Sequence, residues 1–278
     1  MFALVNSSTF PKVASVLRTM LINAPAVKTE RWQGVDVSKN PAAVSYELRN
    51  VCFEVDLESI ESLDHWREEI KPNLPWADDH FAERVSGEPM NPGIQWQRWP
   101  WASSADKFRS GEKIFNHTYM ERLWPRYART EKHLAPPRMG IGWTYGDLDD
   151  LVNLLAKEPH TRQAYIPLFF PEDTGIGDGG RKPCTLGYQI IVRDGEAHIW
   201  YPIRSCDFVR HWADDCYMAV RLLLWVIDRC REISPERWKA VVPGTFAMHA
   251  TSLHIFANDR IQMMKEREYA GPLDQARD

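Results

Sequence analysis

The feature that most constrains the fold of this chain is one long apolar stretch in its C-terminal third. Residues 212–232, which contain "YMAVRLLLWVIDR", have the length of a helix and are apolar on nearly every side, with Arg221 as an interruption. A helix that is apolar all round is buried, because a surface helix keeps a polar face toward water. The apolar run is too short to span a bilayer. The rest of the chain must therefore enclose this helix.

The remaining segments alternate between strand and helix patterns. Strands are predicted at 43–57, 163–170 and 245–259, a hairpin at 186–204, and helices at 10–22, 116–129 with a break at Pro125, 146–159 and directly after 259. Asp194-Gly195 is the expected hairpin turn, and Asp147 is the expected cap of the 146–159 helix. Residues 70–113, rich in proline and tryptophan, are predicted to form a long ligand-binding loop. Without an obvious linker, this mixture predicts one mixed α/β (α+β) domain over residues 1–278.

The composition indicates a globular protein and excludes some classes of partner. Of the 278 residues, 44% are hydrophobic and 26% are charged, and the net charge is −4. This balance is typical of a globular protein and argues against a broad nucleic-acid-binding face, while it leaves room for a local basic pocket that holds one phosphate. The N-terminal residues lack the pattern of a signal peptide. We therefore expect a cytoplasmic protein without a nucleic-acid or membrane partner.

One cysteine is a candidate for chemistry. The chain has five cysteines and no C-x-x-C pair, which favours reduced thiols over a disulfide framework or a zinc site: Cys52, Cys184, Cys206, Cys216 and Cys230. In "RKPCTLGYQ", Cys184 follows a proline and precedes a strand, where a substrate can reach it. Such a thiol becomes a nucleophile when a nearby cation lowers its pKa. The alternative is a small buried structural cysteine.

The polar segment "IRSCDFVRHWADD" leads into the apolar helix. Arg204 and Ser205 can offer a guanidinium and a hydroxyl to one phosphate. The alternative for Arg204 is a surface salt bridge with Asp207. Asp214 and Asp215 fall in the first helical turn, where carboxylates interact favourably with the helix dipole. The sequence alone therefore leaves both a binding role and a capping role open.

Three other features are ambiguous. Glu54 is a carboxylate within a strand pattern, and an unpaired buried charge is costly, so it needs a partner or a purpose. His254 fits either a hydrogen-bonded core histidine or a ligand contact. Trp96, Trp99 and Trp101 fit either packing or a platform for a flat ligand.

Five segments, in this order, resemble the thymidylate synthases and the related pyrimidine-nucleotide hydroxymethylases. They are "LRNVCFEVDL", "DLDDLVNLLAKEPHTRQAYIPLFFPED", "KPCTLGYQIIV", "IRSCD" and "SLHIFAND", within roughly residues 44–259. Each motif is weak alone, and the order and spacing of all five carry the resemblance. It implies a thymidylate-synthase-like domain in which a large mixed sheet is flanked by helices around the buried central helix. It also implies a homodimer with shared sites.

The resemblance implies roles for the nucleotide-binding positions. Cys184 would attack C6 of the pyrimidine ring of a nucleotide monophosphate. Glu54 would organise water and proton transfer at the base. Arg204 and Ser205 would hold the 5′-phosphate, and Arg204 would also favour the thiolate.

Other positions would complete the site. Arg162 would reach the phosphate bound in the neighbouring subunit, and Arg31 would be a further phosphate ligand. His254 would contact the ribose. Trp76 and Asp207 would face 5,10-methylenetetrahydrofolate, which is the cofactor that the resemblance implies.

The chain departs from the family pattern at several positions. Gln163 stands where a second arginine is common, and Thr185 replaces the usual histidine after the nucleophile. Phe256 replaces a tyrosine whose hydroxyl binds the sugar, which leaves the choice between ribose and deoxyribose open. The C-terminal "EYAGPLDQARD" is polar, whereas the synthases close their site with an apolar tail.

Asp215 is the most informative departure. It lies eight residues after Asp207, where the synthases carry an asparagine that reads uracil. A carboxyl group can accept from N4–H of cytosine and share a proton with N3. The phage deoxycytidylate hydroxymethylases carry an aspartate here, and this chain looks like them. A site built for one hydrogen-bond pattern rejects the reverse pattern, so a cytosine nucleotide is the expected substrate.

The expected activity is that of a dCMP 5-hydroxymethylase. Cys184 would add to C6, a one-carbon unit from 5,10-methylenetetrahydrofolate would be joined to C5, and water would then add. The polar C-terminal tail favours water over hydride. Three alternatives stay open: a dCMP 5-methyltransferase, a CMP 5-hydroxymethylase, and a non-catalytic nucleotide-binding relative.

Overall fold

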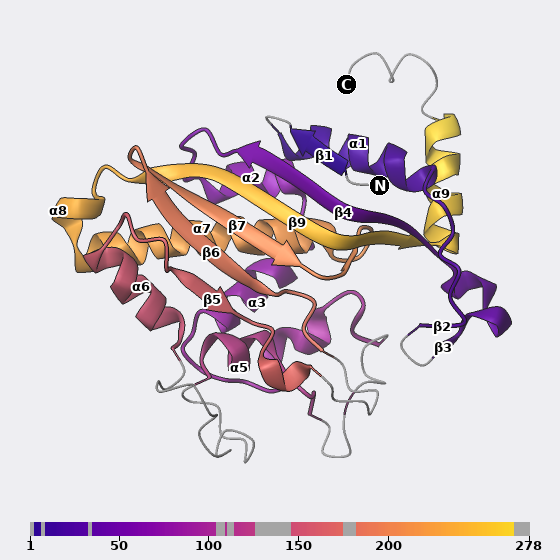
Figure 1. Ribbon diagram of the computed structural model, residues 1–278, viewed down its shortest axis with the longest axis horizontal. Helices are drawn as coiled ribbons and strands as arrows, with labels where there is room; N and C mark the ends of the chain where they lie inside the picture. The colour runs from indigo at the N-terminus through magenta and orange to yellow at the C-terminus, as the bar shows by residue number, and fades with distance from the viewer. Residues whose placement is uncertain are drawn as a thin grey trace.

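A mixed sheet forms the body of the molecule. The computed structural model describes residues 3–6, 9–32, 35–103, 109, 114–125, 146–174 and 182–269. Within them, seven strands form one sheet in the order β1-β4-β9-β7-β6-β5, and β8 also pairs with β9 (Figure 1). The strands are β1 (Ala3–Asn6), β4 (Ser45–Asp56), β5 (Tyr165–Pro167), β6 (Gly187–Arg193), β7 (Glu196–Ile203), β8 (Cys206–Asp207) and β9 (Val242–Phe256). The pairs of β4 with β9, β5 with β6 and β6 with β7 are antiparallel, while β1 with β4, β7 with β9 and β8 with β9 are parallel.

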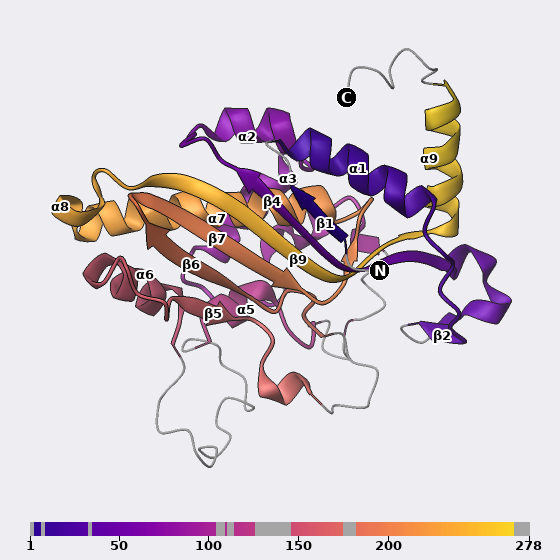
Figure 2. The ribbon, with the colours of Figure 1, turned by 45° about the horizontal axis from the view of Figure 1, so that its top comes forward.

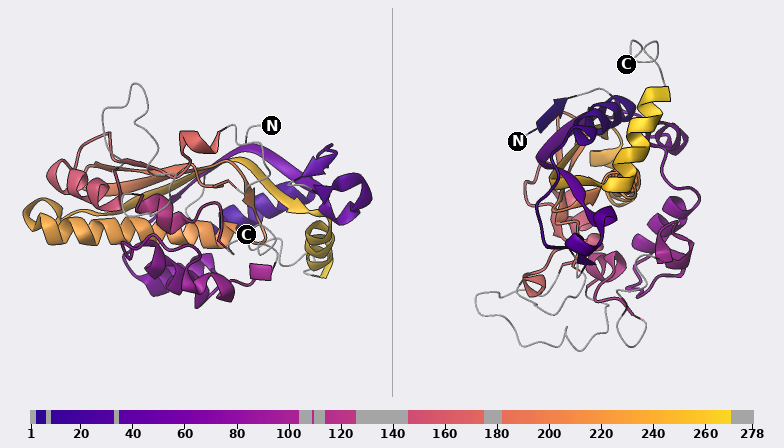
Figure 3. Two further views of the ribbon diagram at one scale, coloured as in Figure 1. Left: turned by 90° about the horizontal axis from the view of Figure 1, so that it is seen from below. Right: turned by 90° about the vertical axis from the view of Figure 1, so that its right-hand side faces the viewer.

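The helices lie mainly on one face of this sheet. They are α1 (Phe10–Ile22), α2 (Leu63–Ile70), α3 (Trp76–Arg84), α5 (Tyr119–Leu123), α6 (Leu148–Lys157), α7 (Trp212–Ile233), α8 (Pro235–Trp238) and α9 (Ala257–Tyr269). The long helix α7 runs along the sheet and has α3 on its other side (Figure 3). None of the described helices has the length and apolarity needed to cross a membrane.

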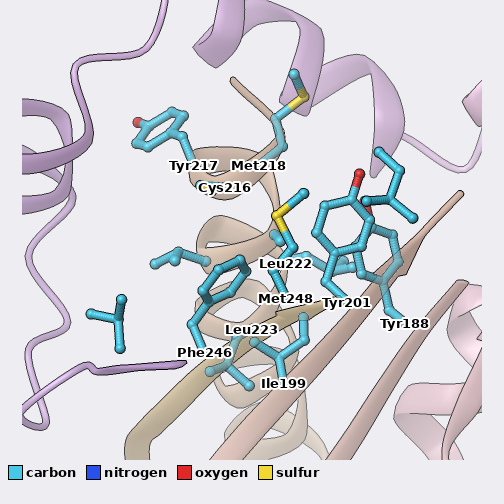
Figure 4. Packing of buried hydrophobic residues seen from close by; sticks show 14 of the residues in the cluster. Tyr188, Ile199, Tyr201, Cys216, Tyr217, Met218, Leu222, Leu223, Phe246 and Met248 are labelled. Carbon is cyan, nitrogen blue, oxygen red and sulfur yellow. The ribbon is translucent and has the colours of Figure 1, made fainter. Parts of the chain in front are cut away.

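Burial on both sides explains the composition of α7. Toward the sheet, Leu222 and Leu223 lie close to Phe246 and Met248 of β9 and to Tyr201 of β7 (Figure 4). All of these side chains are almost completely buried, and each contributes about 1.5–3 kcal/mol of hydrophobic stabilisation. The predicted mixed α/β class, with a buried central helix, is confirmed.

Several local predictions are confirmed closely. The helix at 10–22 has the predicted bounds, and the hairpin turns at Asp194-Gly195, where both residues have positive φ. The side chain of Asp147 accepts from the backbone N–H of Asp150 and caps α6.

The prediction of one irregular stretch over 70–113 is wrong, because it contains α3 and the 3-10 turn η3 (Ile94–Arg98). The side chains that α3 buries include the polar residues His80, Glu83 and Arg84. Helices are predicted from the periodic spacing of apolar residues, and a helix that buries polar side chains lacks this spacing.

The opposite face of the sheet carries exposed side chains. Glu54, Ala247, Trp200, Gln189 and Tyr165 are neighbours in register across β4, β9, β7, β6 and β5. Trp200 is 42% exposed and Tyr165 is 40% exposed. In Figures 1 and 2 this face of the strands is turned toward the viewer and α7 lies behind it. We call it the open face, defined by these five residues.

Candidate active site

A large cavity lies at the N-terminal end of α7. It encloses about 960 Å³, part of it open to solvent, and its walls come from α3, residues 92–99, residues 115–120 and the first turns of α7. It brings together four of the predicted site residues, Cys184, Ser205, Asp215 and Trp76. In the part of the chain that the structure describes, no group of three or more histidine, cysteine or acidic side chains is placed to hold a metal ion.

Cys184 is a partly buried thiol three residues before the start of β6. Arg204 holds the backbone around it. The Arg204 backbone N–H donates to the Cys184 carbonyl at 2.9 Å, and the guanidinium donates to the carbonyls of Pro183 at 2.7 Å and Lys182 at 3.0 Å. Arg204 therefore fixes the segment that carries the thiol, whereas Asp207 pairs with Arg210.

The two adjacent aspartates of α7 have different surroundings. Both oxygens of Asp214 accept hydrogen bonds from Asn73, one from its backbone N–H and one from its side chain, each at 2.8 Å. Asp214 therefore ties α7 to the segment before α3. The Asp215 side chain accepts a weak hydrogen bond from the Cys206 thiol, at 3.8 Å, and one from the Tyr201 hydroxyl. This leaves the Asp215 carboxyl able to bind a ligand in the cavity.

Burial is the main influence on the titration of Asp215. It raises the pKa of Asp215 to about 7, the nearby Asp214 adds to this rise, and the cation Arg84 opposes it. A carboxyl with a pKa near neutrality can both donate and accept a proton at physiological pH.

Hydroxyl groups surround Thr185, the residue after Cys184. The side-chain oxygen of Thr185 is 2.9 Å from the hydroxyl of Tyr201, and its backbone N–H donates to the hydroxyl of Tyr119 at 3.4 Å. Burial raises the pKa of Tyr119, and the negative charges of Cys184 and Asp215 act in the same direction. The Tyr119 hydroxyl is therefore a neutral group beside the thiol.

An aromatic wall forms another side of the cavity. Trp99 stacks on His211 with ring centres 5.0 Å apart, and Trp96 meets Phe115 edge to face at 4.5 Å. The indole nitrogens of Trp96 and Trp99 and the side-chain oxygen of Gln95 are buried without a hydrogen-bond partner. Flat rings with unpaired polar atoms fit a planar heteroaromatic ligand that has donors and acceptors at its edge.

Four residues at this site were not predicted from the sequence: His80, Glu83, Arg84 and Tyr119. His80, Arg84 and Tyr119 line the cavity, and Glu83 contacts His80 from behind. For His80, Glu83 and Arg84, the available signal was their spacing in "HFAER". Residues three and four positions apart share one face of a helix, so three ionisable side chains would lie together if this segment is helical.

Three predicted residues lie at the end of β9 and are not among the residues that line the cavity. Asp207 is in register with His254, whose ring meets Phe256 edge to face at 5.4 Å. Arg210 links Asp207 to Asp259 through hydrogen bonds of 2.8 Å to each carboxylate. His254 is buried, and its burial lowers its pKa.

Four further predicted residues are not among those that line the cavity. One is Arg204, whose guanidinium binds the backbone before β6. Glu54 points to the open face, because its neighbours Phe53 and Val55 face the core and side chains alternate along a strand. Arg162 is exposed just before β5, and Arg31 is exposed in the hairpin of β2 (Arg31–Trp32) and β3 (Val35–Asp36). The polar C-terminal tail after Tyr269 lies outside the described residues.

The sheet, the buried helix and this cavity define a protein with the thymidylate synthase fold. The chain aligns over 92% of its length with 84% of thermostable thymidylate synthase A from Bacillus subtilis, with a TM-score of 0.63 and 14% sequence identity. A putative thymidylate synthase from Methanosarcina barkeri is 23% identical over 185 residues, which are 66% of this chain and 70% of that protein. No family model matches the chain. The chain is thus thymidylate synthase-like in sequence and in fold, as its motifs predicted.

Proposed function

We propose that this protein is a dCMP 5-hydroxymethylase that uses 5,10-methylenetetrahydrofolate. The observation that carries the proposal is that the carboxyl of Asp215 shares one cavity with the thiol of Cys184 and the hydroxyl of Ser205. One nucleotide could then contact Cys184 as the nucleophile, Ser205 as a phosphate ligand and Asp215 as the group that recognises the base.

The chemistry of Asp215 supports cytosine as the base. A carboxyl group that carries one proton can donate to N3 of cytosine and accept from N4–H. The neighbouring Asp214 is already bound to Asn73, which supports Asp215 as the reader. Both carboxylate oxygens of Asp214 are used in this contact with Asn73, whereas Asp215 has no such contact with the segment before α3.

The thiolate of Cys184 would add to C6 and make C5 nucleophilic. When bound, the folate would supply the one-carbon unit for C5. The aromatic wall of Trp76, Trp96 and Trp99 suits its pterin ring, since two of these indoles have unpaired donors. Ser205 and Arg204 would hold the 5′-phosphate.

We propose that the protein acts as a homodimer. The open face presents Trp200 and Tyr165 to solvent, and Arg162 is exposed at its β5 edge. Large exposed apolar side chains on a flat sheet are typical of a buried interface between copies. Such packing would allow Arg162 to reach the phosphate in the partner.

The change Trp200→Glu is expected to separate the dimer, because it would bury two carboxylates in the interface without partners. We expect the dissociation constant to rise by roughly 100-fold or more, measured by sedimentation velocity. Ile233→Glu is the matched control, since Ile233 is exposed at the end of α7 and away from the open face. A Trp200→Glu protein with unchanged self-association would contradict this assignment of the interface.

Product mass tests the activity itself. The protein is incubated with 5,10-methylenetetrahydrofolate and with dCMP, dUMP or CMP in turn. We expect dCMP to gain a hydroxymethyl group and dUMP to remain unchanged. A methyl group on dCMP would identify a methyltransferase, and faster conversion of CMP would identify a ribonucleotide enzyme. Conversion of dUMP alone would overturn the role of Asp215, and no conversion of any nucleotide would indicate a non-catalytic relative.

A further inference from the structure

The cavity holds a buried cation to which the reaction above assigns no role. Arg84 of α3 lines the cavity with Asp215 and is only 7% exposed. Among the described residues it forms no direct ion pair with a carboxylate. Its Nε donates to Nε2 of His80 at 3.2 Å, and its guanidinium carbon lies 4.5 Å from the centre of the Tyr119 ring. A buried guanidinium without a carboxylate partner is costly, so its retention calls for a function.

A relay of contacts fixes the orientation of Arg84. Nδ1 of His80 lies 3.4 Å from one oxygen of Glu83, whose other oxygen accepts from the backbone N–H of Gln95 at 2.7 Å. Trp76 stacks on His80 with ring centres 4.8 Å apart. Because Nε2 accepts from Arg84, the proton of the neutral ring is on Nδ1. Burial and the charge of Arg84 lower the pKa of His80 to about 4, so the ring stays neutral near pH 7.

Arg84 acts on Asp215 through space. Ionisable groups from every neighbouring element surround this carboxyl: Asp214 and Cys216 of α7, Tyr119 of α5, Tyr188 of β6, Tyr201 of β7, Cys206 of β8, and Cys184 before β6. Further ionisable groups line the same cavity: His80, His117, Lys182 and His211. Among the groups that influence the pKa of Asp215, Arg84 is the cation, and its positive charge lowers this pKa and so favours the carboxylate form.

We propose that Arg84 is a positioning residue that draws the proton shared by Asp215 and a bound cytosine onto N3 of the base. This inference rests on the proposed function. As the O–H bond of Asp215 breaks, the N3–H bond forms. The thiolate of Cys184 then bonds to C6, the C5=C6 electron pair moves between C4 and C5, and the C4=N3 pair moves to N3. Arg84 stabilises the carboxylate that Asp215 becomes.

The same arrangement discriminates against uracil. Uracil already carries a hydrogen on N3, so it cannot take the proton of Asp215 at that atom. Its best match is a protonated Asp215 that donates to O4, and a nearby cation disfavours that form. Arg84 therefore adds to the preference for cytosine as well as to the activation of its ring.

The test replaces Arg84 by methionine, which keeps a long side chain and removes the charge. Without the cation the pKa of Asp215 rises, so Asp215 keeps its proton to higher pH. The pH above which kcat/KM for dCMP decreases should therefore be higher in this variant. The constant value of kcat/KM at lower pH should be smaller than in the unaltered protein. We expect the ratio of kcat/KM for dCMP to that for dUMP to drop about tenfold or more. Arg84→Lys should restore part of both effects.

Arg221→Met is the matched control. Arg221 is also a largely buried arginine over an aromatic ring, Phe81 at 4.3 Å, but it pairs with Asp78 and does not line the cavity. It should change neither the substrate ratio nor the pH profile. The proposal is overturned if Arg84→Met leaves both quantities unchanged, or if it lowers the activity on dCMP and dUMP equally at every pH.

A second readout separates this proposal from the proposed function. The carboxyl band of Asp215, obtained as the infrared difference between the protein and Asp215→Asn, is titrated with and without Arg84. A midpoint that moves to higher pH in Arg84→Met supports the coupling even if no nucleotide is converted, in which case the substrate assignment alone fails. Normal conversion of dCMP with an unmoved midpoint overturns the role of Arg84.

Discussion

Asp215→Asn is expected to reverse the base preference of the protein from dCMP to dUMP. An amide donates to O4 and accepts from N3–H of uracil, whereas cytosine presents an acceptor and a donor in the opposite order. Two mismatched contacts cost about 2–6 kcal/mol, so the ratio of kcat/KM for dCMP to kcat/KM for dUMP should fall roughly 30-fold to 10⁴-fold. Steady-state kinetics with both nucleotides at saturating folate gives this ratio.

The adjacent carboxylate supplies the control for this change. Asp214→Asn removes the charged acceptor of Asn73 and should lower the free energy of unfolding by about 1–3 kcal/mol. It should leave the ratio of the two substrates near its original value. If Asp214→Asn changes the base preference and Asp215→Asn does not, the assignment of the two aspartates is reversed. If neither changes it, the base is read elsewhere.

Cys184→Ala is expected to abolish conversion of the nucleotide, by roughly 10⁴-fold or more, because no other step can replace addition to C6. The protein should still bind dCMP, since the thiol contributes little to ground-state binding. With 5,10-methylenetetrahydrofolate present, a dCMP with fluorine at C5 should trap the adduct on the unaltered protein, because C5 cannot lose fluorine as a cation after the one-carbon unit is joined to it. Mass spectrometry of the intact protein should show a mass increase on Cys184 that is absent from Cys184→Ala.

Cys52 provides a matched thiol outside the site. It is partly exposed on β4, and Cys52→Ala should retain both conversion and adduct formation. Persistence of conversion in Cys184→Ala, with the adduct on another cysteine, would refute the role of Cys184 and leave the fold assignment intact.

Local residue patterns were enough to predict the elements whose signals lie within one segment of the chain. The apolar stretch of α7, the Asp194-Gly195 turn and the Asp147 cap depend on residues within one turn or one helix. The motifs also identified Cys184 and Asp215 as candidates, and both line the cavity. Their spacing along the chain is set by β6, β7 and α7, which connect them.

Which polar groups contact one another depends on the tertiary packing and could not be predicted from local patterns. From the sequence, Glu54 was a carboxylate that needed a partner or a purpose. In the structure Phe53 and Val55 face the core, and Glu54 is exposed on the face of the sheet opposite the helices and the cavity. Likewise Asp214 and Asp215 are equivalent as helix-start acids, and the contact with Asn73 distinguishes them. Arg84 was not predicted, because α3 buries charged residues and the sequence of α3 therefore resembles that of a surface segment. Hydrophobic periodicity predicts which side chains are buried. It does not predict the partners of a buried charge, because these come from distant parts of the chain.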